Sequence, residues 1–154
     1  MPYRIAFDLD DTLLSPINEF PYEVFPPPRL IKLLGFEPLR IATKNLFKNL
    51  KANEIEVWIY TSSFRNKFYI KQLFWLYGIR LDGIINGAIH KQRLKNMQDK
   101  PSKFPPAFGI DLLVDNSEGV KMEGQKYRFN VIHIKPQDQL WNQKVINRVM
   151  KELM

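Results

Sequence analysis

The sequence predicts an α/β protein, a three-layer sandwich in which a Rossmann-like, mainly parallel sheet is covered by helices on both faces. Apolar, strand-like runs alternate with helical patterns along the chain. Most of these runs are continuously apolar, which is typical of strands with both faces buried. The chain has 154 residues, 45% of them hydrophobic, which is enough for one domain with a sizeable core. We therefore expect a single domain over residues 1–154.

Five segments have the composition of strands. YRIAFDL (3–9) is a short apolar run, and IEVWIYTSS (55–63) is rich in β-branched and aromatic residues. GIIN (83–86) is a shorter candidate. IDLLVDNS (110–117) and NVIHI (130–134) are again continuously apolar before their polar ends. Together these runs predict the strands of the sheet.

Three segments have helical patterns. Residues 40–53 carry a partial apolar stripe, and residues 138–153 are amphipathic. Residues 64–78 place apolar side chains at i, i+3, i+4 and i+7 before Gly78, which favours a helix end. The apolar positions are Ile41, Leu46, Phe47 and Leu50; Ile70, Leu73, Phe74 and Tyr77; and Trp141, Val145 and Val149.

A flap or small insert is expected at about residues 13–39. Prolines exclude helix and central strand from residues 13–30. They are Pro16, Pro21, Pro26, Pro27 and Pro28. We expect residues 18–29 to lie as a flap over the strand ends. Its aromatic residues could dock a base or a peptide, but the favoured interpretation is that they anchor the loop to the core. They are Phe20, Tyr22 and Phe25.

The bulk composition limits the partners of the chain. A net charge of +7 favours anionic partners such as phosphorylated substrates, nucleic acid or acidic proteins, although solubility alone would also account for it. The stretch 90–103 has five Lys or Arg residues against one acid, and we expect an exposed loop or helix with a modest steering role. Cysteine is absent, which excludes disulfides and thiolate sites. No signal-like leader or bilayer-length apolar run is evident, so we expect a soluble, cytoplasmic protein.

Polar residues gather where three predicted strands end. Asp8 and Asp10 follow the first strand, Thr61 and Ser62 end the second, and Asp115 and Asn116 end the fourth. In parallel sheets the carboxyl ends of the strands meet in one crevice, where ligands bind. A cluster of like charges is unfavourable unless a cation offsets it. Mg²⁺ prefers oxygen ligands and takes few carboxylates, so these ends predict a magnesium site.

The same residues predict phosphoryl chemistry. Asp8, an ionised carboxylate beside the metal, could attack phosphorus. Asp10, two residues on, could protonate the leaving oxygen and later activate water. Thr61 could donate a hydrogen bond to a phosphoryl oxygen, and a lysine could offset the accumulating negative charge.

Three motifs resemble signatures of the haloacid-dehalogenase (HAD) superfamily. FDLDDTL resembles the first signature, D-x-D-x-T, with Asp8, Asp10 and Thr12 in its places. IYTSS resembles the second, ending in Thr61, and LLVDNS resembles the fourth, ending in Asp115. The motifs occur in the family's order, each after its apolar strand, and the resemblance covers most of the chain.

The resemblance implies a Rossmann-like sheet and an aspartyl-phosphate mechanism. Asp8 would be the nucleophile and Asp10 the general acid/base, and the metal ligands would be Asp8, Asp10 through its carbonyl, Asp115 and Asn116. Members with an acid at the position of Asp10 are phosphatases or phosphotransferases, so we expect phosphate chemistry rather than dehalogenation. We also expect Thr61 and Ser62 to bind the substrate phosphate.

The third signature, a lysine, has four candidates before the strand at 110: Lys91, Lys95, Lys100 and Lys103. We favour Lys103, which begins the segment leading into that strand, and place Lys100 second. Both are candidates for binding the substrate phosphate.

Two features qualify the resemblance. Many members have a second acid where this chain has Asn116, and Asn resembles the form found in the branch that dephosphorylates the polymerase C-terminal tail. The stretches between Thr12 and Thr61 and between Thr61 and Asp115 are each too short to hold a full cap domain. We therefore expect no large cap domain, and an open crevice that could admit a macromolecular substrate or be closed by oligomerisation.

The leading hypothesis is a Mg²⁺-dependent phosphatase working through phospho-Asp8. One alternative is a binding or regulatory protein that kept the fold but has weak catalysis. Another is a phosphatase of nucleic-acid ends. These residues do not indicate whether the substrate is a protein, a nucleic acid or a metabolite.

Overall fold

The computed structural model describes residues 1–15 and 17–154. Pro16, one of the prolines in the predicted flap, lies outside the described residues. A five-stranded sheet runs through the described part, with the strand order β3-β2-β1-β4-β5. Every pairing in this sheet is parallel. The strands are β1 (Arg4–Phe7), β2 (Glu56–Tyr60), β3 (Gly83–Ile85), β4 (Leu112–Asp115) and β5 (Val131–His133).

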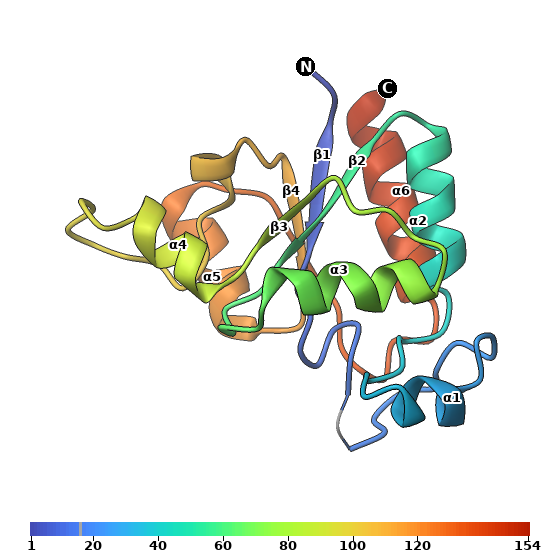
Figure 1. The fold of residues 1–154 in the computed structure, drawn as a ribbon. Coiled ribbons are helices and arrows are strands. Elements are labelled where there is room, and N and C mark those ends of the chain that lie inside the picture. The colour runs from blue at the N-terminus through green and yellow to red at the C-terminus, as the bar shows by residue number, and fades with distance from the viewer. Residues whose placement is uncertain (16) are drawn as a thin grey trace.

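Helices cover both faces of this sheet (Figure 1). On one face lie α2 (Thr43–Ala52), α3 (Lys67–Leu76) and α6 (Trp141–Leu153), whose apolar residues pack in one buried cluster. On the other face lie α4 (Gly87–Arg93), α5 (Glu118–Tyr127) and a 3₁₀ turn, Pro105–Phe108, around a second cluster. The predicted three-layer α/β fold is confirmed.

The two clusters follow from the side-chain alternation of the strands. In β1, Ile5 and Phe7 belong to the first cluster and Ala6 belongs to the second. Successive side chains of a strand point to opposite faces, so a strand between two helix layers must be apolar at every position. The continuously apolar run at the start of the sequence has this cause.

The strand order places a topological switch point beside β1. The chain proceeds outward from β1 through β2 to β3, then returns to β4 on the other side of β1. The connections after β1 and β4 therefore leave in opposite directions, and in open α/β sheets ligands bind at the carboxyl ends of the strands at such a switch point. Asp8 and Asp115 lie at this edge.

The helices differ from the predicted ones in two places. A short helix, α1 (Pro28–Leu33), begins inside the stretch 13–30 that was expected to be irregular, so that prediction was wrong for its last residues. Proline is unfavourable inside a helix but fits its first turn, where no N–H is needed, and Pro28 occupies that place. The helices α4 and α5 were not predicted as separate elements.

The proline-rich connection, residues 17–42, lies beyond the carboxyl end of β1, and α1 belongs to it (Figure 1). Its aromatic residues behave differently from one another. Phe20 is buried, and the half-buried Tyr22 donates from its hydroxyl to the Ser15 carbonyl oxygen. Phe25 is exposed. Phe20 therefore anchors the connection to the core, as the favoured interpretation expected, whereas Phe25 does not.

A buried arginine fixes this connection to the rest of the fold. The Arg40 guanidinium lies between the rings of Phe20 and Trp141, 4.6 and 4.9 Å from their centroids. It donates to the carbonyl oxygen of Thr12 and to three carbonyl oxygens of the connection between β5 and α6. Arg40 thus joins the loop after β1, the proline-rich connection and α6.

Within the part of the chain that the structure describes, no helix has both the length and the apolar character needed to cross a bilayer.

Candidate active site

Two aspartates and a lysine form a buried cluster at the carboxyl edge of the sheet. Asp8 directly follows β1, and its backbone N–H still pairs with the Val114 carbonyl oxygen at 2.8 Å. Asp115 is the last residue of β4. The Lys103 ammonium donates to Asp8 Oδ1 at 2.5 Å and to Asp115 Oδ2 at 2.6 Å. All three side chains are almost fully buried.

Burial controls the electrostatics of this cluster. It raises the pKa of the Asp8 carboxyl to about 6; the Lys103 ammonium opposes this shift and the Asp115 carboxylate adds to it. Burial by itself would lower the pKa of Lys103, but the two carboxylates outweigh it and the pKa is raised. Lys103 is therefore a cation, and with both carboxylates ionised the cluster has one uncompensated negative charge.

The loop after β1 brings two more oxygen-bearing side chains to the cluster. The Thr12 hydroxyl donates to Asp8 Oδ2 at 2.8 Å and lies 3.2 Å from Asn116 Oδ1. Asp11 has a left-handed backbone, with φ of 64°, and turns the chain so that Leu13 and Leu14 return to the core. The Asp8 and Asn116 oxygens thus approach the same hydroxyl from the ends of two neighbouring strands.

Asp10 is much more accessible than Asp8 or Asp115. Its side chain is 41% exposed. Its Oδ1 accepts a hydrogen bond from Arg65 Nη2 at 2.8 Å, and its Oδ2 lies 3.4 Å from Thr61 Oγ1. Thr61 is buried directly after β2, and its hydroxyl also lies 3.0 Å from Ser63 Oγ. Asp10 and Thr61 therefore face each other across the strand ends.

The predicted site residues are not all in this place. The structure joins Asp8, Lys103 and Asp115 directly and brings Asn116 to them through Thr12. At the same edge of the sheet it pairs Asp10 with Thr61. Ser62 and Lys100 instead line a surface pocket with His90 and Ser102. Among the described residues, no hydrogen bond joins Ser62 or Lys100 to the cluster. Lys103, rather than Lys100, is the lysine in contact with the two aspartates.

The segment that presents Lys103 is held by a tyrosine and a histidine. The Tyr60 hydroxyl accepts a hydrogen bond from the backbone N–H of Phe104 at 2.9 Å and lies 2.5 Å from His90 Nδ1. His90 Nε2 lies 3.1 Å from the Pro101 carbonyl oxygen. Burial lowers the pKa of His90, which favours the neutral ring. The residues on both sides of Lys103 are thus fixed to β2 and α4.

The loop after β2 is fixed from α4 as well. Asn86 is the N-cap of α4, and its Nδ2 donates to the Arg65 carbonyl oxygen at 2.9 Å. The N–H of Gly87 donates to the Ser63 carbonyl oxygen at 2.7 Å. A Cβ on Gly87 would lie 2.6 Å from the Ser62 carbonyl oxygen, so this close approach requires glycine.

Sequence reasoning missed four residues that contact the cluster or support it. Arg65 and Glu37 form an ion pair beside Asp10, and Tyr60 and His90 hold the Lys103 segment. Arg65 lies four residues after Thr61, and its closeness to the second signature could have identified it as a candidate site residue. Glu37 and His90 are isolated in sequence, and only the fold brings them near the site.

The donor set fits a hard dication. Asp8, Asp115, Asn116 and the Asp10 carbonyl offer only oxygen atoms, and the buried cluster has a negative charge left to compensate. Each Asp115 carboxylate oxygen already accepts one hydrogen bond, from Lys103 or from the Ser117 N–H, and keeps a further lone pair. Among the described residues, no group of three or more His, Cys, Asp or Glu side chains is arranged as a metal centre. The candidate ligands are instead two carboxylates, one amide and one backbone carbonyl.

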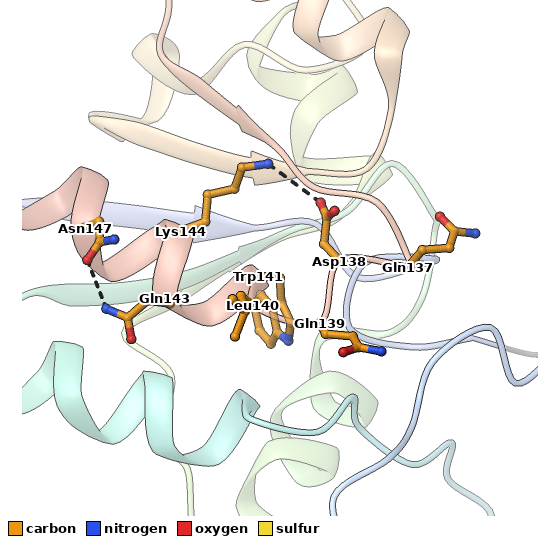
Figure 2. Close-up of a pocket in the computed structure, with 8 residues that line it drawn as sticks. All are labelled: Gln137, Asp138, Gln139, Leu140, Trp141, Gln143, Lys144 and Asn147. Atoms are coloured by element: carbon orange, nitrogen blue, oxygen red, sulfur yellow. Dashed lines mark hydrogen bonds and ion pairs between the residues drawn. The ribbon is translucent and has the colours of Figure 1, made fainter.

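A separate surface pocket lies where α6 begins (Figure 2). Its lining includes four amide side chains, Leu140, Trp141 and an ion pair of 3.7 Å between Lys144 and Asp138. It shares none of its lining residues with the Asp8 cluster.

Comparisons with known proteins identify the fold. No protein-family model and no curated protein sequence matches the chain. A chain in the structure of the Pnkp1/Rnl/Hen1 RNA repair complex is similar over 90% of this chain, with 17% identity and a TM-score of 0.55; the match spans 44% of that longer chain. A HAD-superfamily hydrolase of subfamily IA from Geobacter sulfurreducens is similar over 86% of this chain and 89% of its own, with 11% identity and a TM-score of 0.54.

A predicted HAD-like family hydrolase from Porphyromonas gingivalis is similar over 98% of both chains, with 13% identity and a TM-score of 0.50. Sequence identities this low establish the fold and leave the activity open. The five-stranded parallel sheet between two helix layers, together with these neighbours, shows that the chain has the HAD-like fold.

Proposed function

We propose that the chain is a Mg²⁺-dependent phosphomonoesterase that transfers the phosphoryl group of its substrate to Asp8. One observation carries the proposal: Lys103, 95 residues from Asp8 in the chain, is buried between Asp8 and Asp115 at the switch point of the sheet. A buried charged cluster in a crevice of this kind is an unfavourable arrangement for stability alone and marks a candidate active site.

The first half-reaction transfers the phosphoryl group. An Asp8 carboxylate oxygen forms a bond to phosphorus while the bond from phosphorus to the ester oxygen breaks. Asp10 gives a proton to that leaving oxygen. The Thr61 hydroxyl and the Lys103 ammonium donate to the phosphoryl oxygens, where negative charge accumulates.

The second half-reaction restores the carboxylate. Asp10, now ionised, takes a proton from a water molecule as the water oxygen attacks phosphorus. The bond between phosphorus and the Asp8 oxygen breaks, and inorganic phosphate leaves. Mg²⁺, when held by Asp8, Asp115, Asn116 and the Asp10 carbonyl, would supply positive charge beside the transferring group.

The size of the connections supports a single domain without a large cap. Between β1 and β2 the described residues form only α1 and α2, and between β2 and β4 only two helices, the strand β3 and a 3₁₀ turn. Such a crevice would admit a phosphate at the end of a larger molecule. This openness leaves small-molecule and macromolecular substrates as candidates.

Hydrolysis of an aryl phosphate with and without Mg²⁺ tests the proposal. We expect metal-dependent turnover by the wild type and none by Asp8→Asn, because an amide cannot form the acyl phosphate. Asp11→Asn is the matched control: it removes a neighbouring carboxylate, and asparagine tolerates the left-handed backbone of that position. Substantial turnover by Asp8→Asn would refute the assignment of the nucleophile.

A second candidate substrate is the phosphorylated end of a nucleic acid. The net charge of +7 favours it, and one of the structural neighbours belongs to an RNA repair complex. Activity on such ends should fall steeply with salt, because contacts to the nucleic-acid backbone release counterions. Turnover of a small phosphomonoester would change far less over the same salt range. A matched salt dependence for both substrates would argue against this candidate.

The remaining alternative is a binding or regulatory protein with weak catalysis. We expect Mg²⁺ with beryllofluoride, a mimic of the phosphoryl group on a carboxylate, to raise the melting temperature of the wild type but not of Asp8→Asn. If the wild type shows neither turnover nor this stabilisation, the binding-protein interpretation takes first place.

A further inference from the structure

Arg65 holds two carboxylates that come from different parts of the chain. Its Nη2 donates to Asp10 Oδ1 at 2.8 Å, and its Nη1 lies 2.8 Å from Glu37 Oε2. Asp10 belongs to the loop after β1, and Glu37 belongs to the proline-rich connection. Arg65 itself lies in the loop between β2 and α3. The guanidinium is therefore the point at which three loops around the crevice meet.

The contacts of Arg65 are poorly suited to a purely stabilising role. The side chains of Arg65, Asp10 and Glu37 are 27, 41 and 34% exposed, and ion pairs this accessible add little to stability. Among the described residues, Arg65 Nε is the buried side-chain nitrogen that has no hydrogen-bond partner. An unpaired buried donor is unfavourable. The arrangement is better explained by the group that Arg65 holds than by the stability it provides.

The position of Arg65 is fixed from several sides. Its carbonyl oxygen accepts from Asn86, and its guanidinium lies 5.8 Å from the centroid of the Tyr69 ring. The Tyr69 ring stacks on Phe36, the residue before Glu37, with 4.9 Å between ring centroids. The connection that carries Glu37 is thus linked to the Arg65 loop by an ion pair and to the following helix, α3, by a ring stack.

This frame orients the Asp10 carboxylate. Arg65 engages Oδ1, which leaves Oδ2 facing the Thr61 hydroxyl at 3.4 Å. In the proposed mechanism Thr61 binds the transferring phosphoryl group, so Oδ2 is the oxygen directed at the leaving group. A half-exposed carboxylate without this contact would sample other rotamers, and its proton would be misplaced for transfer.

We propose that Arg65 is a positioning residue for the general acid/base Asp10, and that Glu37 couples the proline-rich connection to this role by holding the other side of the guanidinium. The inference rests on the proposed phosphatase function. It predicts that the acid–base step depends on a residue of the connection outside the predicted signature motifs.

Dependence on the leaving group distinguishes positioning from other roles. An aryl phosphate with an acidic phenol needs little help from a general acid, whereas an alkyl phosphate needs its leaving oxygen protonated. The variants are Arg65→Ala, Arg65→Lys and Glu37→Gln, and kcat and KM are measured on both substrates. Arg29→Ala, which removes an exposed arginine from α1 in the same connection, is the matched control.

We expect Arg65→Ala to lower kcat/KM on the alkyl phosphate by roughly tenfold more than on the aryl phosphate, which is part of the 10²–10⁴-fold that general acid–base catalysis contributes. This ratio reports on phosphoryl transfer to Asp8 and not on the later attack of water, which both substrates share. KM should change little on either substrate. Arg65→Lys should recover part of the loss, because lysine keeps the charge but cannot engage two carboxylates with a fixed fork. Glu37→Gln, which changes no side-chain shape, should show a smaller loss with the same leaving-group dependence.

Equal losses of kcat/KM on both substrates, or a loss that comes from a raised KM alone, would overturn the inference, because Arg65 would then bind the phosphoryl group or only support the loop. Unchanged kinetics in Arg65→Ala would overturn it as well. If Arg65→Ala does not fold, Glu37→Gln decides: no selective loss on the alkyl phosphate refutes the coupling. Turnover retained in Asp8→Asn would instead refute the proposed function, and the inference would fall with it.

Discussion

Replacing Lys103 by methionine probes the buried charge cluster most directly. Methionine is nearly as long as lysine and apolar, so the variant removes the ammonium without opening a large cavity. It leaves Asp8 and Asp115, which now contact the ammonium at 2.5 and 2.6 Å, as two buried carboxylates with no cation between them. The perturbation is therefore mainly electrostatic.

The expected loss in the free energy of unfolding is large for one substitution. Breaking a buried ion pair by removing one partner costs about 3–5 kcal/mol. For a chain of this size, a change of 1 kcal/mol shifts the melting temperature by roughly 2–4 °C, so Lys103→Met should melt roughly 6–20 °C lower than the wild type at pH 7.5 without metal. Asp8 has a pKa of about 6 even beside the lysine, so at pH 5 it takes up a proton and the penalty should shrink.

Thermal denaturation in chelator at pH 7.5 and pH 5 measures this effect. Lys100→Met is the control, because it makes the same change at an exposed lysine three residues earlier. We expect the control to stay within about 0.5 kcal/mol of the wild type. A loss below about 1 kcal/mol for Lys103→Met at pH 7.5, or a loss that does not depend on pH, would show that Asp8 and Asp115 do not depend on this ammonium.

Three further predictions test other parts of the structure. The folded-state pKa of Asp8 is raised above its unfolded value, so its contribution to stability is present below about pH 4 and lost as pH rises through about 6. Between pH 4 and pH 7 in chelator, the free energy of unfolding of Asp8→Asn should therefore rise by up to about 3 kcal/mol relative to that of the wild type, as measured by urea denaturation. A difference between the two proteins that stays the same at every pH would contradict this. Arg40→Leu removes a donor from four carbonyl oxygens and should cost about 3 kcal/mol or more in the same assay, whereas a loss under about 1 kcal/mol would show that the guanidinium is not needed. Gly87→Ala should cost about 1–3 kcal/mol and lower turnover, because its Cβ would press on the Ser62 carbonyl oxygen at 2.6 Å; wild-type stability and turnover would refute the close approach.

Much of the fold follows from local patterns in the sequence. All five strands lie inside the segments that the apolar runs predicted. A strand buried on both faces needs apolar residues at successive positions, so it forms a continuous apolar run in the sequence. The helices α2, α3 and α6 also lie within their predicted ranges. The missed elements have weaker signals: α1 begins at a proline, α4 is short, and α5, although as long as α2 and α3, has few apolar residues.

The candidate site was predictable where its residues end strands. Asp8, Thr61 and Asp115 each follow or end an apolar run, and parallel topology brings such ends together. Among four candidate lysines the sequence favours Lys103, which begins the segment leading into β4, but a loop gives no periodic signal for which side chain turns inward. Arg65 lies close to the second signature, but the sequence holds no pattern that pairs it with Asp10 or with Glu37, because the three residues come from separate loops.

Trapping the phosphorylated enzyme tests whether Asp8 accepts the phosphoryl group. The Asp10→Asn variant should form the phosphorylated intermediate slowly and hydrolyse it more slowly still. This variant is therefore incubated with Mg²⁺ and an aryl phosphate labelled on its phosphoryl group, quenched in acid and digested. We predict that the label is on the peptide containing Asp8 and absent from the Asp8→Asn, Asp10→Asn double variant. Metal-dependent turnover by the wild type with no label on that peptide, or label retained in the double variant, would contradict an aspartyl-phosphate on Asp8.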